Sequence, residues 1–207
     1  MRIAITISFL LITAVTRSQS VYNISKDYFR ADPFKNPFNN FISQLINDPA
    51  ITEKKITKRS DSVLFYFEGI YKTGNPFFIP VEKCKIILAE KEDRTDDSTR
   101  TPFFYYEYQL IGFSGNTKES LKDVKQEFEK LNKKFSRTLS KEEARELKRN
   151  NEVAGNIINY SYKNMAFIPV TLAWASLAEP QDYIIAITLR FLNINNVAYL
   201  PIPADSP

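Results

Sequence analysis

Two blocks of strand-forming sequence are separated by an amphipathic helical segment, and this order allows only a few folds. Residues 62–113 and 166–202 are rich in aromatic and β-branched residues, with turn residues between the runs. Strands on both sides of a helix, without βαβα alternation, indicate the α+β class. We predict an antiparallel or mixed sheet of about six strands with two or three helices packed on it. The central helix begins at Asn116 or Thr117, and its apolar residues recur every three or four positions: Leu121, Val124, Phe128, Leu131 and Phe135.

Two shorter helices are also predicted. Asn36-Pro37 is typical of a helix start, and the apolar stripe that follows indicates a helix over residues 37–47. The segment Ser140-Lys-Glu-Glu143 matches a capping box, which predicts a second helix up to about residue 150. Residues 152–163 fit either a strand or an extension of that helix, and we favour the strand. The charged residues 50–60 are interpreted as a solvated connection, and no internal repeat is visible.

The amino terminus has the composition of a secretory signal peptide. Arg2 provides a basic start, and the uncharged run Ile3–Val15 follows. A transmembrane helix needs roughly 20 apolar residues, whereas a signal peptide needs about 7–15. Ser18 and Ser20 predict cleavage after residue 20, and Ala14 and Thr16 mark a second site. We therefore expect a secreted or periplasmic protein, the alternative being a buried amino-terminal strand.

Behind the signal peptide of residues 1–20, residues 21–35 are predicted to be a flexible lead-in. Residues 36–207 are predicted to form a single α+β domain, since no low-complexity linker divides them. The formal net charge of +4 falls when Arg2 and Arg17 leave with the signal. This charge is too small to indicate nucleic acid or an anionic membrane as a partner.

The absence of histidine excludes several kinds of chemistry. Ser–His and Cys–His nucleophilic catalysis both need an imidazole base, and the chain contains no histidine. The single cysteine, Cys84, cannot form an internal disulfide, and its alternating environment predicts a buried thiol. One cysteine without histidine also excludes a closed zinc site. No glycine-rich phosphate loop is present, and we expect no cofactor.

Carboxylate chemistry remains as the enzymatic alternative. A glycosidase needs only two suitably spaced carboxyl groups, and Glu68, Glu107 and Asp182 lie on or beside predicted strands. Nothing in the sequence pairs these residues. An isolated acidic residue on a strand normally faces solvent, so an enzyme is the weaker interpretation.

The acidic loop 90–98 offers a weak calcium site, because calcium prefers hard oxygen ligands. Its candidate ligands are Asp93, Asp96 and Asp97. The loop lacks the spacing of a calcium-binding loop and carries Lys91 and Arg94 among its acids. A solvated hairpin tip is therefore the favoured interpretation.

The strand 103–113 is unusually aromatic, and Tyr105, Tyr106 and Tyr108 are candidate binding residues. A central strand that is covered on both faces is the competing interpretation. By exclusion, the sequence favours a non-enzymatic, exported binding domain that binds or neutralises another protein. The alternatives are a carboxylate-dependent hydrolase and a structural envelope component. The Asn23 and Asn159 sequons matter only in a eukaryotic source, and the sequence fixes neither the partner nor the oligomeric state.

Overall fold

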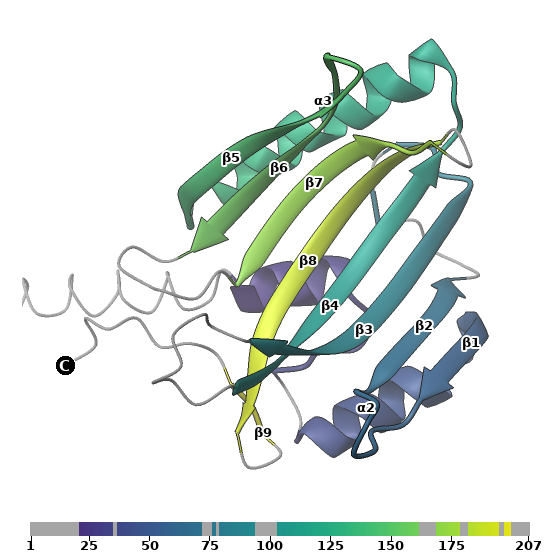
Figure 1. Ribbon diagram of the computed structural model, residues 1–207, viewed down its shortest axis with the longest axis vertical. Coiled ribbons are helices and arrows are strands. Elements are labelled where there is room, and N and C mark those ends of the chain that lie inside the picture. Colours follow the sequence, from purple (N-terminus) through teal and green to yellow (C-terminus); the bar gives the residue numbers. More distant parts are fainter. Residues whose placement is uncertain are drawn as a thin grey trace, which may run out of the picture.

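The computed structural model describes residues 21–34, 37–71, 76–77, 79–93, 103–161, 169–178, 182–194 and 197–199. They form one antiparallel sheet with helices on one of its faces (Figure 1). The α+β class and the antiparallel sheet are thus confirmed. The prediction of about six strands is wrong, because eight strands follow one another in the order β1-β2-β3-β4-β8-β7-β6-β5 and the short β9 pairs with β8.

The element order is repeated along the chain. Helix α2 (Phe38–Asn47) precedes four strands: β1 (Ile51–Thr57), β2 (Tyr66–Tyr71), β3 (Lys83–Asp93) and β4 (Phe103–Ser114). Helix α3 (Lys118–Phe135) precedes four more: β5 (Ser140–Arg149), β6 (Glu152–Ser161), β7 (Val170–Ser176) and β8 (Tyr183–Ile194). The last strand is β9 (Val197–Tyr199). The two sets of four meet where β4 pairs with β8, so the sheet order is mirrored about this pair. No such repeat is visible in the sequence.

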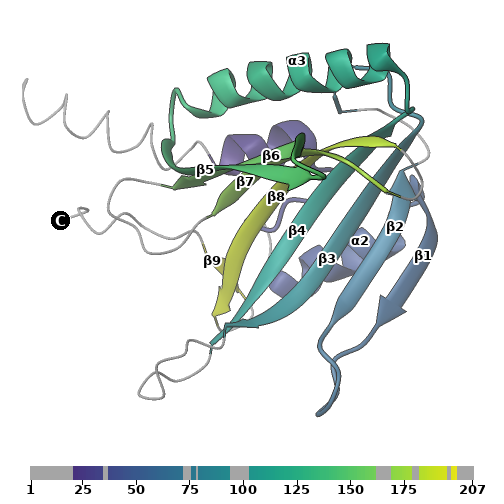
Figure 2. The same ribbon diagram turned by 45° about the horizontal axis from the view of Figure 1, so that its top comes forward.

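The helices pack on the same face of the sheet, which we call the covered face (Figures 1 and 2). On α2, Phe41 packs edge to face against Tyr108 of β4 and Phe191 of β8. On α3, Phe135 packs against Tyr160 of β6, whose hydroxyl donates a hydrogen bond to Asn132 at 2.8 Å. These contacts join both helices to one hydrophobic core on the covered face.

The predicted central helix is confirmed, including its start. Thr117 caps α3, and its hydroxyl accepts a hydrogen bond from the backbone N–H of Ser120 at 3.0 Å. Helix α2 begins at Phe38, with Pro37 preceding it, and Asn36 lies outside the described residues. Among the helices that the structure describes, none is both long and apolar enough to cross a membrane.

Residues 140–149 form the strand β5 and not the predicted helix. Lys, Glu, Ala, Leu and Arg are among the residues with the highest helix propensity, but tertiary pairing overrides such a local preference. Here Asn150 and Asn151 have φ angles of 51° and 66°. Two consecutive positive φ angles give the two-residue turn that joins strands in a hairpin, and asparagine tolerates them well. The turn therefore folds β5 back on β6, and the preference for a strand over residues 152–163 is confirmed by β6.

Two other expectations are corrected near the amino terminus. Residues 21–28 are helical, and Val21, Ile24 and Tyr28 are buried, so the core begins in the segment that we expected to be a flexible lead-in. Residues 51–57, expected as a solvated connection, form the edge strand β1, which explains its outward-facing charges. The predicted signal peptide, residues 1–20, lies outside the described residues.

Candidate binding face

The other face of the sheet, which we call the open face, carries none of the described helices (Figure 1). Directly paired residues of neighbouring strands point to the same side of a sheet, so the register identifies this face. One row crosses from Ile111 on β4 through Ala186, Ala173 and Ile157 to Arg145 on the edge strand β5. Every strand of this half of the sheet thus contributes to the open face.

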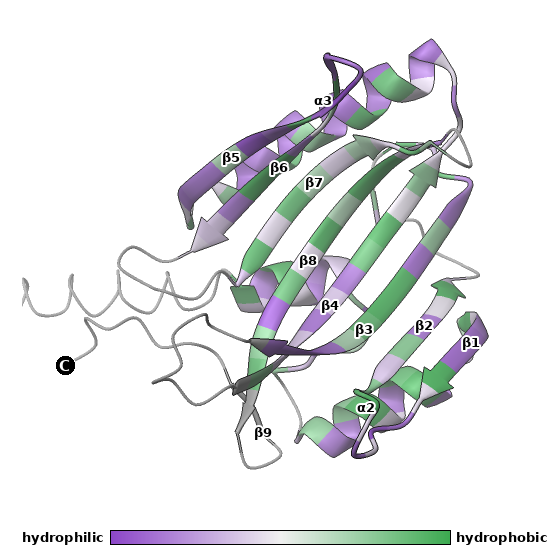
Figure 3. Cartoon of the chain, in the orientation of Figure 1, coloured by the Kyte–Doolittle hydropathy of each residue, from purple (hydrophilic) through white to green (hydrophobic). Residues whose placement is uncertain are grey.

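Solvent-facing positions of an antiparallel sheet are normally polar, but one end of the open face is apolar. Figure 3 shows hydrophobic residues along β7 and β8 in contrast to the hydrophilic edge strand β5. The apolar side chains come from five adjacent strands, and each is partly exposed. We call them the apolar strip: Leu147, Ile157, Ala173, Ala175, Ile111, Phe113, Ile184 and Ala186.

The apolar strip is separate from the core. None of its members is among the buried core residues or among the partly buried residues that pack against the core. Its centre is shallow, because alanines occupy β7 and β8, and Gly155 lies on β6 directly opposite Ala175. An added Cβ at Gly155 would lie 2.5 Å from the backbone oxygen of Trp174 and 3.1 Å from Leu147 Cδ1. The small residues therefore keep this part of the open face flat.

Beside the apolar strip, polar side chains are hydrogen-bonded across the strands. Arg190 on β8 donates from Nε to Glu107 Oε1 on β4 at 2.9 Å, which forms an ion pair. The same guanidinium donates from Nη1 to the hydroxyl of Thr171 on β7 at 2.7 Å. Arg190 and Glu107 are largely buried, with 24% and 13% of their side chains exposed. The geometry fixes the guanidinium between two neighbouring strands.

This network continues to the edge of the sheet. The Thr171 hydroxyl donates to Asn159 Oδ1 at 2.8 Å, and Asn159 Nδ2 donates to Glu143 Oε2 at 3.1 Å. Gln109 donates to Glu107 at 3.4 Å on the other side. We call this chain of contacts the polar ladder; it crosses five strands through Gln109, Glu107, Arg190, Thr171, Asn159 and Glu143. The ladder holds the strands in register and orders the polar half of the face.

A second polar group lies on β1, β2 and β3. Glu68 accepts a hydrogen bond from the Tyr66 hydroxyl at 2.6 Å and pairs with Lys85 and Lys55. Its contacts with Lys85 and Tyr66 lower the pKa of Glu68 to about 2. Burial and the hydrogen bond to Glu68 raise the pKa of Tyr66 to about 12. Glu68 is therefore held as a carboxylate at neutral pH.

These contacts bear on the carboxylate alternative. A general acid in a glycosidase needs a raised pKa, whereas the pKa of Glu68 is lowered. Glu107 is bound to Arg190. Asp182 lies just before β8, and its backbone oxygen accepts a hydrogen bond from Leu177. The described geometry thus uses Glu68 and Glu107 as partners of basic residues within the sheet.

The predicted tyrosines do not lie together. Tyr106 and Tyr108 are 6% and 0% exposed and pack against α2, so the structure places both rings in the core, and their binding role stays an untested prediction. Their alternation along β4 places them on the covered face. Tyr105 lies on the open face and is partly exposed. The apolar strip was not predicted from the sequence, although the apolar residues at alternate positions 173 and 175 of β7 and 184 and 186 of β8 were a signal for it.

The candidate calcium site lies largely outside the described residues. Asp93 is the last residue of β3, and Asp96 and Asp97 fall in the segment that the structure does not describe. Among the described residues, no group of three or more histidine, cysteine or acidic residues is arranged to hold a metal ion. The calcium site stays a prediction.

One hollow, of about 490 Å³, lies near the end of the helix at residues 21–28. Residues 26–30 line it together with Asp48, Tyr71 and Pro76. Two of its lining residues, Arg30 and Asp48, pair with each other at 2.7 Å, and a third, Asp27, pairs with Lys134 of α3 at 2.9 Å. These ion pairs connect the amino-terminal segment to the rest of the fold.

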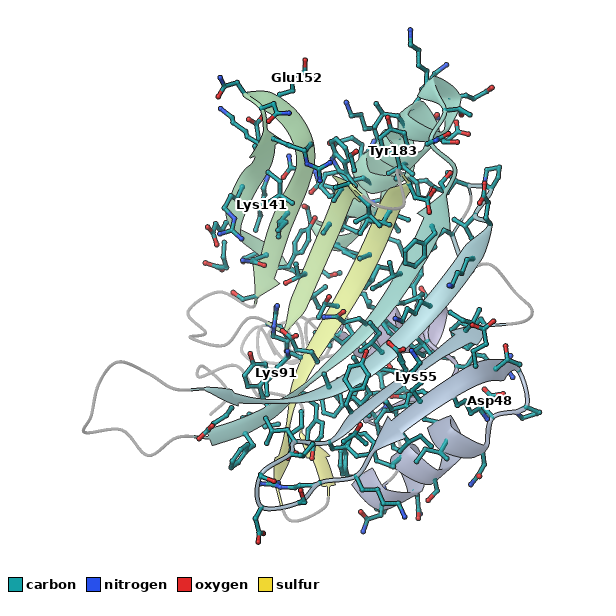
Figure 4. All side chains as sticks on the ribbon, turned by 45° about the vertical axis from the view of Figure 1, so that its right-hand side comes forward. Asp48, Lys55, Lys91, Lys141, Glu152 and Tyr183 are labelled. Carbon is teal, nitrogen blue, oxygen red and sulfur yellow. The ribbon has the colours of Figure 1, made fainter. Side chains whose placement is uncertain are left out.

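The edges of the sheet are unsuited to pairing with another strand. Glu53 in β1 has a φ angle of 51°, and the register of β1 shifts between Thr52 and Lys55. Irregularities of this kind and charged side chains prevent an edge from pairing with other chains. The opposite edge strand, β5, is charged along its length; Figure 4 shows Lys141 and Glu152 toward opposite ends of the β5–β6 hairpin. Neither edge is built for strand addition.

Comparison with protein-family models, curated proteins and solved structures gives no match for this chain.

Proposed function

We propose that this protein is an exported, non-enzymatic binding domain that binds another protein through the apolar strip on its open face. The observation that carries the proposal is the apolar strip itself. Eight partly exposed apolar side chains lie side by side on a face where water contact would favour polar residues. Contiguous exposed apolar surfaces of this kind mark sites of interaction.

The polar ladder supports the same proposal. An interface combines an apolar centre with polar groups whose positions are fixed before binding. Arg190 is held by Glu107 and Thr171, so it loses little freedom when a partner covers it. The blocked edges at β1 and β5 direct a partner to the face and argue against strand addition or assembly as a structural component.

Export is part of the proposal and has its own test. The uncharged run Ile3–Val15 behind Arg2 predicts removal of residues 1–20. Intact-mass analysis of the protein from the exported fraction should give a chain that begins at Val21. A full-length chain recovered from the cytosol would contradict this part.

Capture of a partner tests the binding face. We would use the secreted protein as bait in the exported fraction of its source, with chemical cross-linking. Ala173→Glu places a charge in the centre of the apolar strip and should abolish capture of any stoichiometric partner. Ala144→Glu is the matched control, because Ala144 is exposed on β5 and its register partner Ile158 lies on the covered face. Equal capture by both variants would refute the proposed face.

A further inference from the structure

Basic residues lie on both sides of the apolar strip. On β3, Lys83 pairs with Phe113 and Lys85 pairs with Ile111. The Lys83 Nζ atom lies 5.9 Å from the centre of the Phe113 ring, so the ammonium group borders the apolar surface. On the far side, Arg145 of β5 pairs with Ile157. Both Lys83 and Arg145 are exposed.

Three acidic residues of the open face are each engaged with a polar partner of their own. Glu68 binds Lys85 and Lys55, and Glu107 binds Arg190. Glu143 accepts a hydrogen bond from Asn159 at the end of the polar ladder. None of the eight positions of the apolar strip carries an acidic side chain. A partner that covers the strip therefore meets basic groups at both of its borders.

This charge pattern disfavours a second copy of the chain as the partner. If two copies stacked face to face about an axis along the strands, β3 of one copy would lie over β5 of the other, and Lys83 would lie near Arg145. An axis across the strands would place β3 over β3 and lysine against lysine. Opposed like charges suppress such pairings. An occupant that carries negative charge opposite these basic groups is therefore favoured.

The width of the apolar strip, and the packing of a helix on the covered face, indicate which kind of partner segment fits the strip. Five adjacent strands span about 19 Å at the usual spacing of 4.8 Å, which equals the length of about 13 helical residues. The same sheet already packs a helix on its covered face, where α3 contributes Val124, Phe128 and Leu131 to the core. A helix with one apolar face suits the flat alanine-lined centre in the same way.

Resting on the proposed function, we infer that the partner presents an amphipathic helix whose apolar stripe is flanked by Asp or Glu. The stripe covers the apolar strip, and the flanking carboxylates face Lys83 and Arg145. Such rim charges mainly increase the rate of association, and salt weakens their effect.

Two synthetic peptides of 18 residues test this inference. Both carry leucines at helical spacing, flanked by glutamates in one and by lysines in the other, and fluorescence anisotropy measures their binding to the secreted protein. The glutamate peptide should bind, and the lysine peptide should not. Lys83→Glu with Arg145→Glu should weaken binding of the glutamate peptide at least tenfold. Lys118→Glu with Lys122→Glu, on exposed positions of α3, makes the same change in net charge and should alter binding less than twofold.

Three results would overturn the inference: equal binding of both peptides, equal loss in the two charge-reversal variants, or a dimer of the protein in sedimentation analysis. The Ala173→Glu variant distinguishes failure of the acidic-helix inference from failure of the proposed function. Suppose that Ala173→Glu abolishes capture of a natural partner, while the glutamate and lysine peptides bind equally. The proposed binding face is then supported, and the inference that the partner presents an acidic helix is wrong. If Ala173→Glu affects neither assay, both proposals fail.

Discussion

Replacing Glu90 by glutamine should destabilise the protein markedly. The Glu90 side chain is fully buried on the covered face, at the end of β3. Its oxygens accept hydrogen bonds from Arg59 Nη1 at 2.7 Å, from the Tyr106 hydroxyl at 3.1 Å and from the backbone N–H of Phe65 at 3.0 Å. One carboxylate thus fixes the segment before β2 against β3 and β4.

The size of the effect follows from these three contacts. In Glu90→Gln, one oxygen becomes an NH₂ group, which faces either the Phe65 N–H or the Arg59 and Tyr106 donors and so leaves at least one of these donors without an acceptor. An unsatisfied buried polar group costs about 1–3 kcal/mol, and a hydrogen bond to a charged group contributes roughly 1.5–3 kcal/mol. The Arg59 side chain is 52% exposed, so water can solvate it, and its hydrogen bond to Glu90 contributes less to the free energy of unfolding. We expect a total loss of about 2–3 kcal/mol.

Guanidinium unfolding followed by tryptophan fluorescence measures this loss. For a domain of this size the expected change corresponds to roughly 5–10 °C in the melting temperature. Glu152→Gln, at an exposed position after the β5–β6 turn, is the matched control and should change stability by less than about 0.5 kcal/mol. If Glu90→Gln were equally mild, the buried hydrogen-bond network would not stabilise the fold as argued.

Three further predictions concern the turn, the thiol and the pH dependence of stability. Asn151→Ala should lower the free energy of unfolding by about 1–2 kcal/mol, because alanine disfavours the φ of 66° at this position; an unchanged melting temperature would argue against the turn. Cys84 should not react with a disulfide reagent at pH 8 until the protein is unfolded, because burial raises the pKa of its thiol to about 12; rapid labelling of the native protein would contradict this. Because the folded-state pKa of Glu68 is lowered to about 2, its contribution to stability is present above about pH 4.5 and is lost as the pH falls toward 2. The stability difference between wild type and Glu68→Gln should shrink over this range, and a constant difference would show that the contacts of Glu68 do not shift its pKa.

The candidate site was only partly predictable. Alternation along β4 separated Tyr105 from Tyr106 and Tyr108, but it could not say which face the helices cover. The helices cover the side of Tyr106 and Tyr108, which leaves those two rings in the core. The polar ladder could not be predicted, because its contacts join residues far apart in the sequence, such as Glu107 and Arg190.

Local patterns alone determined the α+β class, the amphipathic helix α3 with its Thr117 cap, and most of the central strands. These features depend on side-chain periodicity and on hydrogen bonds between near neighbours, which a sequence displays directly. Tertiary structure decided the strand at 140–149, the burial of the helix at residues 21–28 and the mirrored order of the sheet. A strand gains most of its stability from the neighbour it pairs with, so helix-forming residues such as those of β5 become a strand once the Asn150–Asn151 turn brings β6 beside them.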